Sequence, residues 1–102
     1  MKNLVMVVHA SVQQELADTL RGLAQVRGFT FSHVEGHSAQ SGRDPFLSAR
    51  DRVVGYVPRI RVDILLEDAD LDPVLAMLCG GETGVAGQGV YWVTAVERHG
   101  RL

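Results

Sequence analysis

The last twenty residues hold the groups best suited to binding an anion. A glycine-rich segment of the form T-G-x-x-G-x-G runs from Thr83 to Gly89, and an aromatic and β-branched stretch then leads to Arg98 and Arg101. Glycines let the backbone approach a ligand closely, and successive N–H groups in such a turn can surround an anion. An arginine fork suits phosphate or carboxylate. The alternative is that these glycines serve only a hairpin turn.

Four histidines and one cysteine suggest a second chemistry, a metal site. His33 and His37 are four residues apart, a spacing that pairs ligands on a helix, but their segment is predicted to be a strand entering a loop. One chain is therefore not expected to form a zinc site alone, although one histidine from each subunit of an oligomer would gather several. His37 is the best candidate ligand and His33 the second. Cys79, on an apolar helix face, is predicted to pack.

No nucleophile–base pair is evident, and we do not expect an enzyme. Ser38 and Ser48 lie near His37 in the sequence, but no acidic residue is placed to orient the imidazole. On strand 59–66, Arg59 and Arg61 alternate with Asp63, which favours a salt-bridge ladder between subunits over a binding surface. Tyr91 and Trp92 are expected to pack in the core or in an interface rather than to stack on a base.

Composition and charge exclude several partners. The chain has 102 residues, is 46% hydrophobic and 22% charged, and carries a net charge of −2. These values are typical of one soluble domain spanning residues 1–102, with no general attraction to nucleic acid. A single cysteine argues against a secreted disulfide framework, and no apolar run approaches the length of a membrane span. We expect a cytoplasmic protein without membrane insertion.

The hydrophobic pattern predicts a strand and a helix in the first 28 residues. The apolar run 4–8 is typical of a buried strand. Ser11 begins a capping box, after which Leu16, Leu20 and Leu23 fall on one helical face. Gly28 suits the end of this helix.

The remaining pattern predicts a strand at 29–35, an exposed polar loop from 36, and an alternating strand at 59–66. Asp72 is expected to cap a second helix that ends at Gly80, and residues 91–96 form the last strand. The buried stripe of that helix is predicted to be Leu71, Val74, Leu75 and Leu78. This order is an α+β ferredoxin-like βαββαβ sandwich, with an antiparallel sheet and both helices on one face.

In this order of elements the chain resembles the PII family of signalling proteins. Those proteins have a long "T-loop" between the second and third strands and a "B-loop" of form T-G-x-x-G-x-G before the fourth. Here the T-loop would span residues 36–56, and the B-loop matches at Thr83, Gly84, Gly87 and Gly89. The run 36–38 and the ending 100–102 are similar to a compact PII-like family of uncharacterised function, often associated with heavy-metal efflux systems.

The resemblance implies a homotrimer with three clefts between subunits, each lined by the T-loop base of one subunit and the B-loop of its neighbour. PII proteins bind ATP or ADP there, and their T-loop docks onto transporters or enzymes. The implied effector-binding residues are Gly36, His37, Ser38, Thr83, Gly84, Gly87, Gln88, Gly89, Arg98 and Arg101. The implied contacts to a membrane transporter or efflux component are Gln40, Arg43, Phe46 and Arg50.

The chain departs from the nucleotide-binding pattern at the T-loop base, where the run 36–38 replaces an arginine, and at two positions of the B-loop. Val90 stands where a lysine usually follows the last glycine, and Gln88 stands where an acidic residue is usual. Loss of a phosphate-facing lysine removes a charge-assisted bond of about 1.5–3 kcal/mol, which is roughly a tenfold to hundredfold loss of affinity. An adenine nucleotide and a smaller anion both stay open as effectors. The alternative functions are a metal-responsive trimer linked to heavy-metal efflux, similar in fold to the CutA proteins, and a module that binds only protein.

Overall fold

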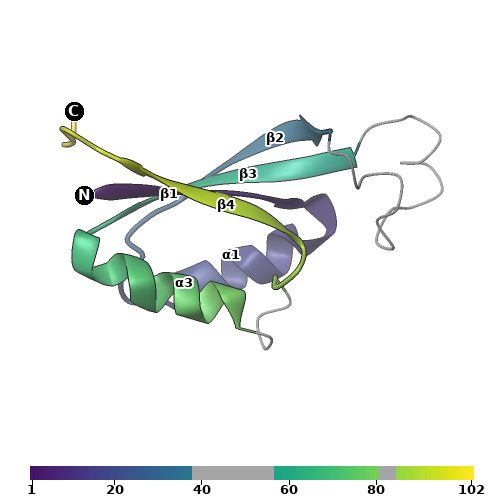
Figure 1. Ribbon diagram of the computed structural model, residues 1–102, viewed down its shortest axis with the longest axis horizontal. Coiled ribbons are helices and arrows are strands. Elements are labelled where there is room, and N and C mark those ends of the chain that lie inside the picture. Colours follow the sequence, from purple (N-terminus) through teal and green to yellow (C-terminus); the bar gives the residue numbers. More distant parts are fainter. Residues whose placement is uncertain (38–56, 81–84) are drawn as a thin grey trace.

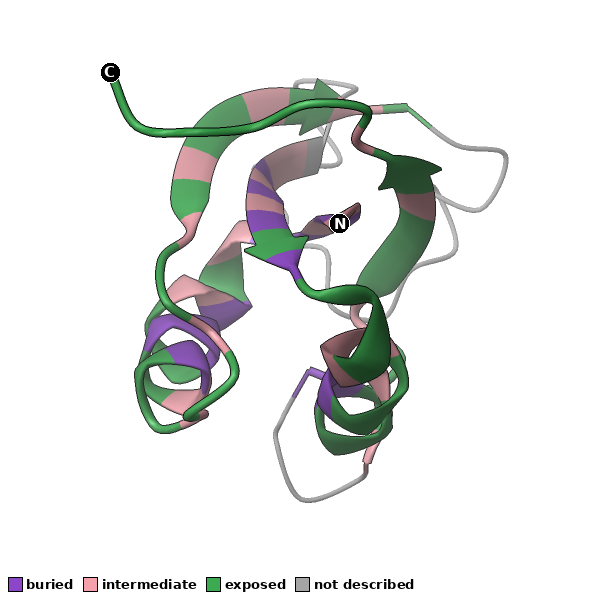
Figure 2. Cartoon of the chain, turned by 90° about the vertical axis from the view of Figure 1, so that its left-hand side faces the viewer, coloured by how far each residue is buried: buried purple, intermediate pink, exposed green. Residues whose placement is uncertain are grey.

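The computed structural model describes residues 1–37, 57–80 and 85–102 and shows a four-stranded sheet with both helices packed on one face (Figures 1 and 2). The strands are β1 (Lys2–His9), β2 (Thr30–Gly36), β3 (Val57–Leu66) and β4 (Gly89–Ala95), and the helices are α1 (Gln13–Arg21) and α3 (Leu71–Cys79). The strand order is β2-β3-β1-β4, and all neighbouring strands are antiparallel. The predicted α+β fold with βαββαβ order is confirmed.

The core lies between the sheet and the helices. Alternation along β3 turns Ile60, Val62, Ile64 and Leu66 toward the helices, as predicted, and each is at most 1% exposed. The other fully buried side chains of this layer are Leu4, Val8, Leu16, Leu20, Val74 and Leu78. Burial of this apolar surface is the main favourable term for the fold. Leu71 and Leu75 pack at its border, so the predicted stripe of α3 is confirmed.

The first helix begins differently from the prediction. A short 3₁₀ helix, Ala10–Val12, precedes α1, and it is capped by His9, whose Nδ1 accepts a hydrogen bond from the Ser11 backbone N–H at 3.1 Å. The prediction of Ser11 as the N-cap was wrong, because the last side chain of β1 already supplies the acceptor. Val12, which precedes α1, makes no side-chain capping bond.

The helix boundaries also differ from the prediction. α1 ends at Arg21, where the Gly22 N–H bonds back to carbonyls of the last turn, and Gly28 does not end it. A 3₁₀ helix, Asp68–Asp70, leads into α3, so Asp72 lies in the first turn rather than at the cap. Gly80 ends α3 as predicted. Cys79 is exposed, because α3 turns that position away from the sheet, and its predicted packing role was wrong.

The pairing register defines two ends of the sheet. His9, Gly36, Val57 and Gly89 lie at one end, which we call the loop end. The opposite end, which we call the terminal end, holds Lys2, Thr30, Leu66 and Ala95, and both chain termini lie there (Figure 1). The seven steps of β1 separate the two ends by about 23 Å, at roughly 3.3 Å per residue.

The helices leave the other face of the sheet uncovered (Figure 2). On this outer face, Val90 is 62% exposed, Trp92 is 42% exposed and Leu65 is 49% exposed. Tyr91 pairs with Met6 on the opposite, helix-covered side of the sheet and is 51% exposed. Neither Tyr91 nor Trp92 is therefore buried in the core of the single chain, and their packing in an interface stays a prediction. In residues 1–37, 57–80 and 85–102, no helix is long and apolar enough to cross a membrane.

Candidate functional site

The end of the predicted B-loop forms a tight turn at the loop end of the sheet. The Gln88 N–H donates to the Val85 carbonyl at 3.0 Å, which closes a β-turn over these four residues. Gly87 has a φ of 77°, a left-handed conformation that L side chains rarely adopt. Glycine at this position is therefore required by the turn itself.

Gly89 is required for a different reason, the close approach of β4 to β1. A Cβ at this position would overlap the Val7 carbonyl oxygen and lie 2.8 Å from Val8 Cα. The obstacle is the backbone of a central strand, which cannot move aside as a flexible side chain could. The described glycines of the motif thus have structural roles, as the hairpin-turn alternative supposed, and their presence is not by itself a sign of phosphate.

The end of β2 lies at the same end of the sheet. His37 follows Gly36, and its Nε2 lies 3.4 Å from a carboxylate oxygen of Glu35, with both side chains about two-thirds exposed. Arg59 of β3 connects this region to the turn, since its guanidinium donates to the Gln88 carbonyl at 3.4 Å. The stem of the same side chain lies where a Cβ of Gly36 would be, so in one chain the T-loop base and the end of the B-loop both lie against Arg59.

His33 does not join His37. It lies opposite Ile60 on the helix-covered side of β2, and four residues of strand separate the two histidines by about 13 Å. Among the described residues, no three of the types His, Cys, Asp and Glu gather around a common point. His33 and His37 are therefore not part of such a group within one chain, and a metal site that either histidine forms with other subunits stays a prediction.

A hollow of about 770 Å³ lies at the terminal end, which we call the terminal hollow. The C-terminal tail rises from the sheet on the side away from the helices (Figure 2) and supplies His99 and Arg101 to it. Arg27, just before β2, adds a second guanidinium, whereas Arg98 is not among the lining residues. The acidic residues of the lining are Asp63, Glu67 and Asp70.

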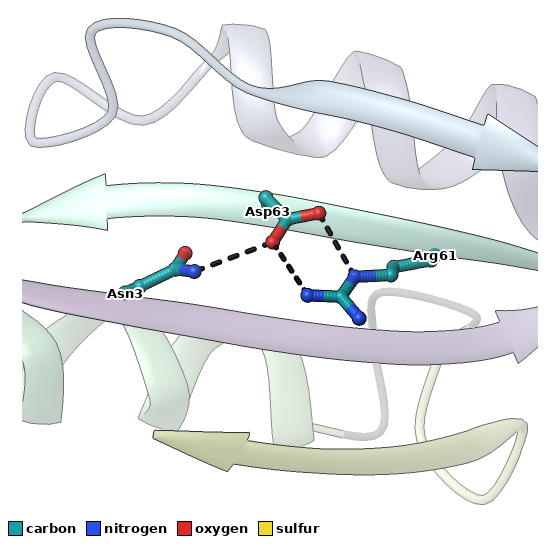
Figure 3. Close-up of polar contacts among 3 residues, drawn as sticks. All are labelled: Asn3, Arg61 and Asp63. Carbon is teal, nitrogen blue, oxygen red and sulfur yellow. Dashed lines mark hydrogen bonds and ion pairs between the residues drawn. The ribbon is translucent and has the colours of Figure 1, made fainter. Parts of the chain in front are cut away.

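Asp63 is held in place by two neighbours on the outer face (Figure 3). Arg61 donates from Nε and from a terminal nitrogen to the two carboxylate oxygens at 3.1 Å each, and the Asn3 amide donates at 3.3 Å. The hydrogen bond from Arg61, supported by Asn3, holds the pKa of Asp63 below its usual value against the opposing effect of partial burial. The Arg61 guanidinium also lies 5.9 Å from the ring centre of Trp92.

The candidate residues therefore fall into two groups, at opposite ends of the sheet. Gly36, His37, Gly87, Gln88 and Gly89 gather at the loop end, whereas Arg101 lies in the terminal hollow. Seven other candidates lie outside the described residues: Ser38, Gln40, Arg43, Phe46, Arg50, Thr83 and Gly84.

Sequence reasoning missed Arg27 and Arg59 as members of these groups. The signal for Arg27 was its position directly before Gly28 and β2, and the signal for Arg59 was its place near the start of β3. Neither position can be related to the tail or to the turn until the order of the strands is known.

Comparison with protein families and solved structures adds the evolutionary context. The model of a family described as "Protein of unknown function (DUF3240)" matches residues 1–102. The fold is similar to the crystal structure of a DUF3240 family protein from Shewanella baltica, with a TM-score of 0.76 and 20% sequence identity. That match covers 99% of this chain and 94% of the other.

Curated relatives match over almost the whole chain. Nitrogen regulatory protein P-II 2 of Methanothermobacter thermautotrophicus is 25% identical over 100% of this chain and 89% of its own length. Nitrogen regulatory protein P-II of Rhodospirillum rubrum is 23% identical over 100% and 91%. Nitrogen regulatory protein GlnK of Escherichia coli is 22% identical over 96% and 88%. The predicted resemblance to PII proteins is confirmed as a distant relationship along the chain.

Proposed function

Because the chain belongs to the DUF3240 family and is distantly related along its length to the P-II nitrogen regulatory proteins, we propose that it is a PII-like trimeric regulatory protein. In this proposal a small anionic or nucleotide effector binds in the cleft between subunits. Segment 36–56, with Gln40, Arg43, Phe46 and Arg50, then regulates a membrane transporter or efflux component. The protein acts as a regulator and catalyses no reaction.

The main support for this proposal is the distance between the two groups of candidate residues. Gln88 and Arg101 lie at opposite ends of a sheet whose ends are about 23 Å apart. One small effector cannot contact both groups of one chain, but it can contact the loop end of one copy and the terminal hollow of another. We therefore revise the expected cleft. One subunit contributes both the T-loop base and the B-loop, and its neighbour contributes the terminal hollow.

The chemistry of the terminal hollow favours a nucleotide over a bare anion. Arg27 and Arg101 supply charged donors, whereas Glu67 and Asp70 supply acceptors that would repel a small anion. A nucleoside phosphate satisfies both kinds of group, because its phosphates accept hydrogen bonds while its ribose hydroxyls and its base amino group donate them. Bicarbonate offers no comparable set of donors.

The outer face of the sheet supports self-association. Val90, Trp92 and Leu65 expose large apolar side chains beside the half-buried Arg61–Asp63 pair. Contiguous exposed apolar surface on a soluble protein commonly marks an interface. A closed ring of three copies through this face would bury these side chains and bring each terminal hollow toward a neighbour.

The test is thermal stabilisation of the purified oligomer by ATP, ADP, AMP and bicarbonate, each compared in wild type, Arg101→Gln and Arg98→Gln. Both arginines are exposed tail residues, but only Arg101 lines the terminal hollow. An effector at a hundred times its dissociation constant should add about 2.7 kcal/mol. We expect Arg101→Gln to weaken binding roughly tenfold to hundredfold and Arg98→Gln to leave it unchanged. Equal losses in both variants would contradict the composite cleft.

A metal-responsive trimer is the alternative, and the contact between His37 and Glu35 supports it. One nitrogen and one oxygen ligand from each of several copies would form a site that no single chain holds. This alternative predicts stabilisation by Cu(II), Zn(II), Ni(II) or Co(II) that is lost in His37→Ala and kept in His33→Ala. If neither nucleotides, bicarbonate nor metals stabilise the protein, only a protein partner is left as its ligand.

A further inference from the structure

One side chain of β3 spans the loop end of the sheet. Arg59 lies opposite Val34 of β2 and opposite His9 of β1 in the register. Its guanidinium donates to the Gln88 carbonyl at 3.4 Å, and the same carbonyl accepts the His9 backbone N–H at 3.0 Å. The carbonyl that precedes β4 is therefore held by the backbone of one strand and by the side chain of another.

The middle of the Arg59 side chain, from Cγ to Nε, lies over Gly36. A Cβ at position 36 would come within 2.5 Å of Arg59 Cγ and 2.8 Å of its Nε. Among the described glycines only Gly87 has a positive φ, so Gly36 is not needed for its backbone conformation. A side chain at position 36 would instead have to displace the stem of Arg59, which occupies the space beside Gly36.

We propose that Arg59 is a positioning residue that couples the turn Val85–Gln88 to the end of β2. Any ligand that displaces the Gln88 carbonyl also moves the guanidinium that is bonded to it. The stem of that same side chain rests on Gly36, so the displacement reaches the residue from which segment 36–56 departs. The link to regulation rests on the proposed function, whereas the mechanical coupling is a property of the chain without effector.

Arginine suits this position better than lysine. Its planar guanidinium carries several N–H donors at the end of the side chain. A lysine side chain is one bond shorter and ends in a single nitrogen. Arg59→Lys therefore keeps the charge and most of the contact with Gly36 but loses the bond to Gln88. Arg59→Met keeps only the stem.

The experiment perturbs the turn without any ligand and measures the response at β2. Gly87→Ala strains the turn at its φ of 77°, and amide NMR shifts report the response at Gly36 and His37. We expect clear shifts at both amides in the wild-type background. In Arg59→Met and Arg59→Lys, the same perturbation should still shift Gln88 and Gly89, but the shifts at Gly36 and His37 should fall several-fold.

Gly28→Ala is the matched control, because a Cβ at Gly28 meets nothing within 4 Å and lies at the terminal end. It should leave the Gly36 amide unshifted. Shifts at Gly36 that are equal with and without Arg59 would overturn the coupling. Failure of every nucleotide to bind would overturn the proposed effector alone, because this comparison uses none. If Arg59→Met does not fold, Arg59→Lys gives the same comparison.

Discussion

Arg61 and Asp63 form a pair that their alternation on β3 did not suggest. The alternation predicted a ladder of ion pairs between subunits, which stays a prediction, and within one chain the two residues pair with each other on the outer face. Residues two apart on a strand share a face, and the long arginine side chain reaches along it. Val5 of β1 lies between Asp63 and Trp92 in the register. Its side chain is only 1% exposed, although no helix covers this face of the sheet.

The lowered pKa of Asp63 makes a prediction about acid stability. A carboxyl whose folded pKa lies below its unfolded value contributes stability above that unfolded value, about 3.9, and the contribution is lost as pH falls through the folded pKa. Asp63→Asn should therefore lower the urea midpoint at pH 7 and make little difference near pH 2. Urea unfolding at both pH values measures this, and Glu97→Gln, at an exposed tail position, is the control. An equal loss at both pH values would show that Asp63 acts through packing and not through its charge.

At the scale of elements, patterns that repeat along the chain were more informative than single boundary residues. The alternation from Ile60 to Leu66 predicted β3 and its buried side correctly, because every second residue adds to the same signal. The ends of α1 rested on one residue each, and both were misplaced. His9 competes with Ser11 as the cap, and the backbone bonds of Gly22 end the helix before Gly28.

Leu20 and Leu23 test where α1 ends. The sequence placed both on one buried stripe, but Leu20 is fully buried on α1 whereas Leu23 follows the helix and is only partly buried. Leu20→Ala should cost about 2–5 kcal/mol of unfolding free energy, because it leaves a cavity in the core. Leu23→Ala should cost clearly less, and the difference can be measured by urea unfolding of both variants. Equal costs would mean that the stripe continues past Arg21 as the sequence suggested.

At the scale of the whole molecule, the candidate site depends on the order of the strands and on distances in space, which the sequence does not state. The T-G-x-x-G-x-G pattern identified the turn, but the strand order β2-β3-β1-β4 decides that Gln88 contacts Arg59 and that Arg101 and Arg27 line the same hollow. The distance between those two groups then makes a second copy of the chain necessary for one effector to contact both. Assembly through the outer face of the sheet is thus part of the proposed effector site.

Substitutions of Trp92 and Met77 distinguish assembly through the outer face from a general effect of exposed hydrophobic side chains. Trp92 is 42% exposed on the outer face of the sheet, and Met77 is 51% exposed on α3, on the helix side. Trp92→Glu places a charge in the proposed interface, where desolvation is costly, so it should dissociate the oligomer and abolish effector stabilisation. Met77→Glu should change neither. Light scattering after gel filtration measures the mass of each variant, and the thermal shift of each variant then reports whether the effector still binds. A Trp92→Glu trimer that still binds the effector would mean that the subunits meet through another surface, and a wild-type monomer that binds it would mean that no composite site is needed.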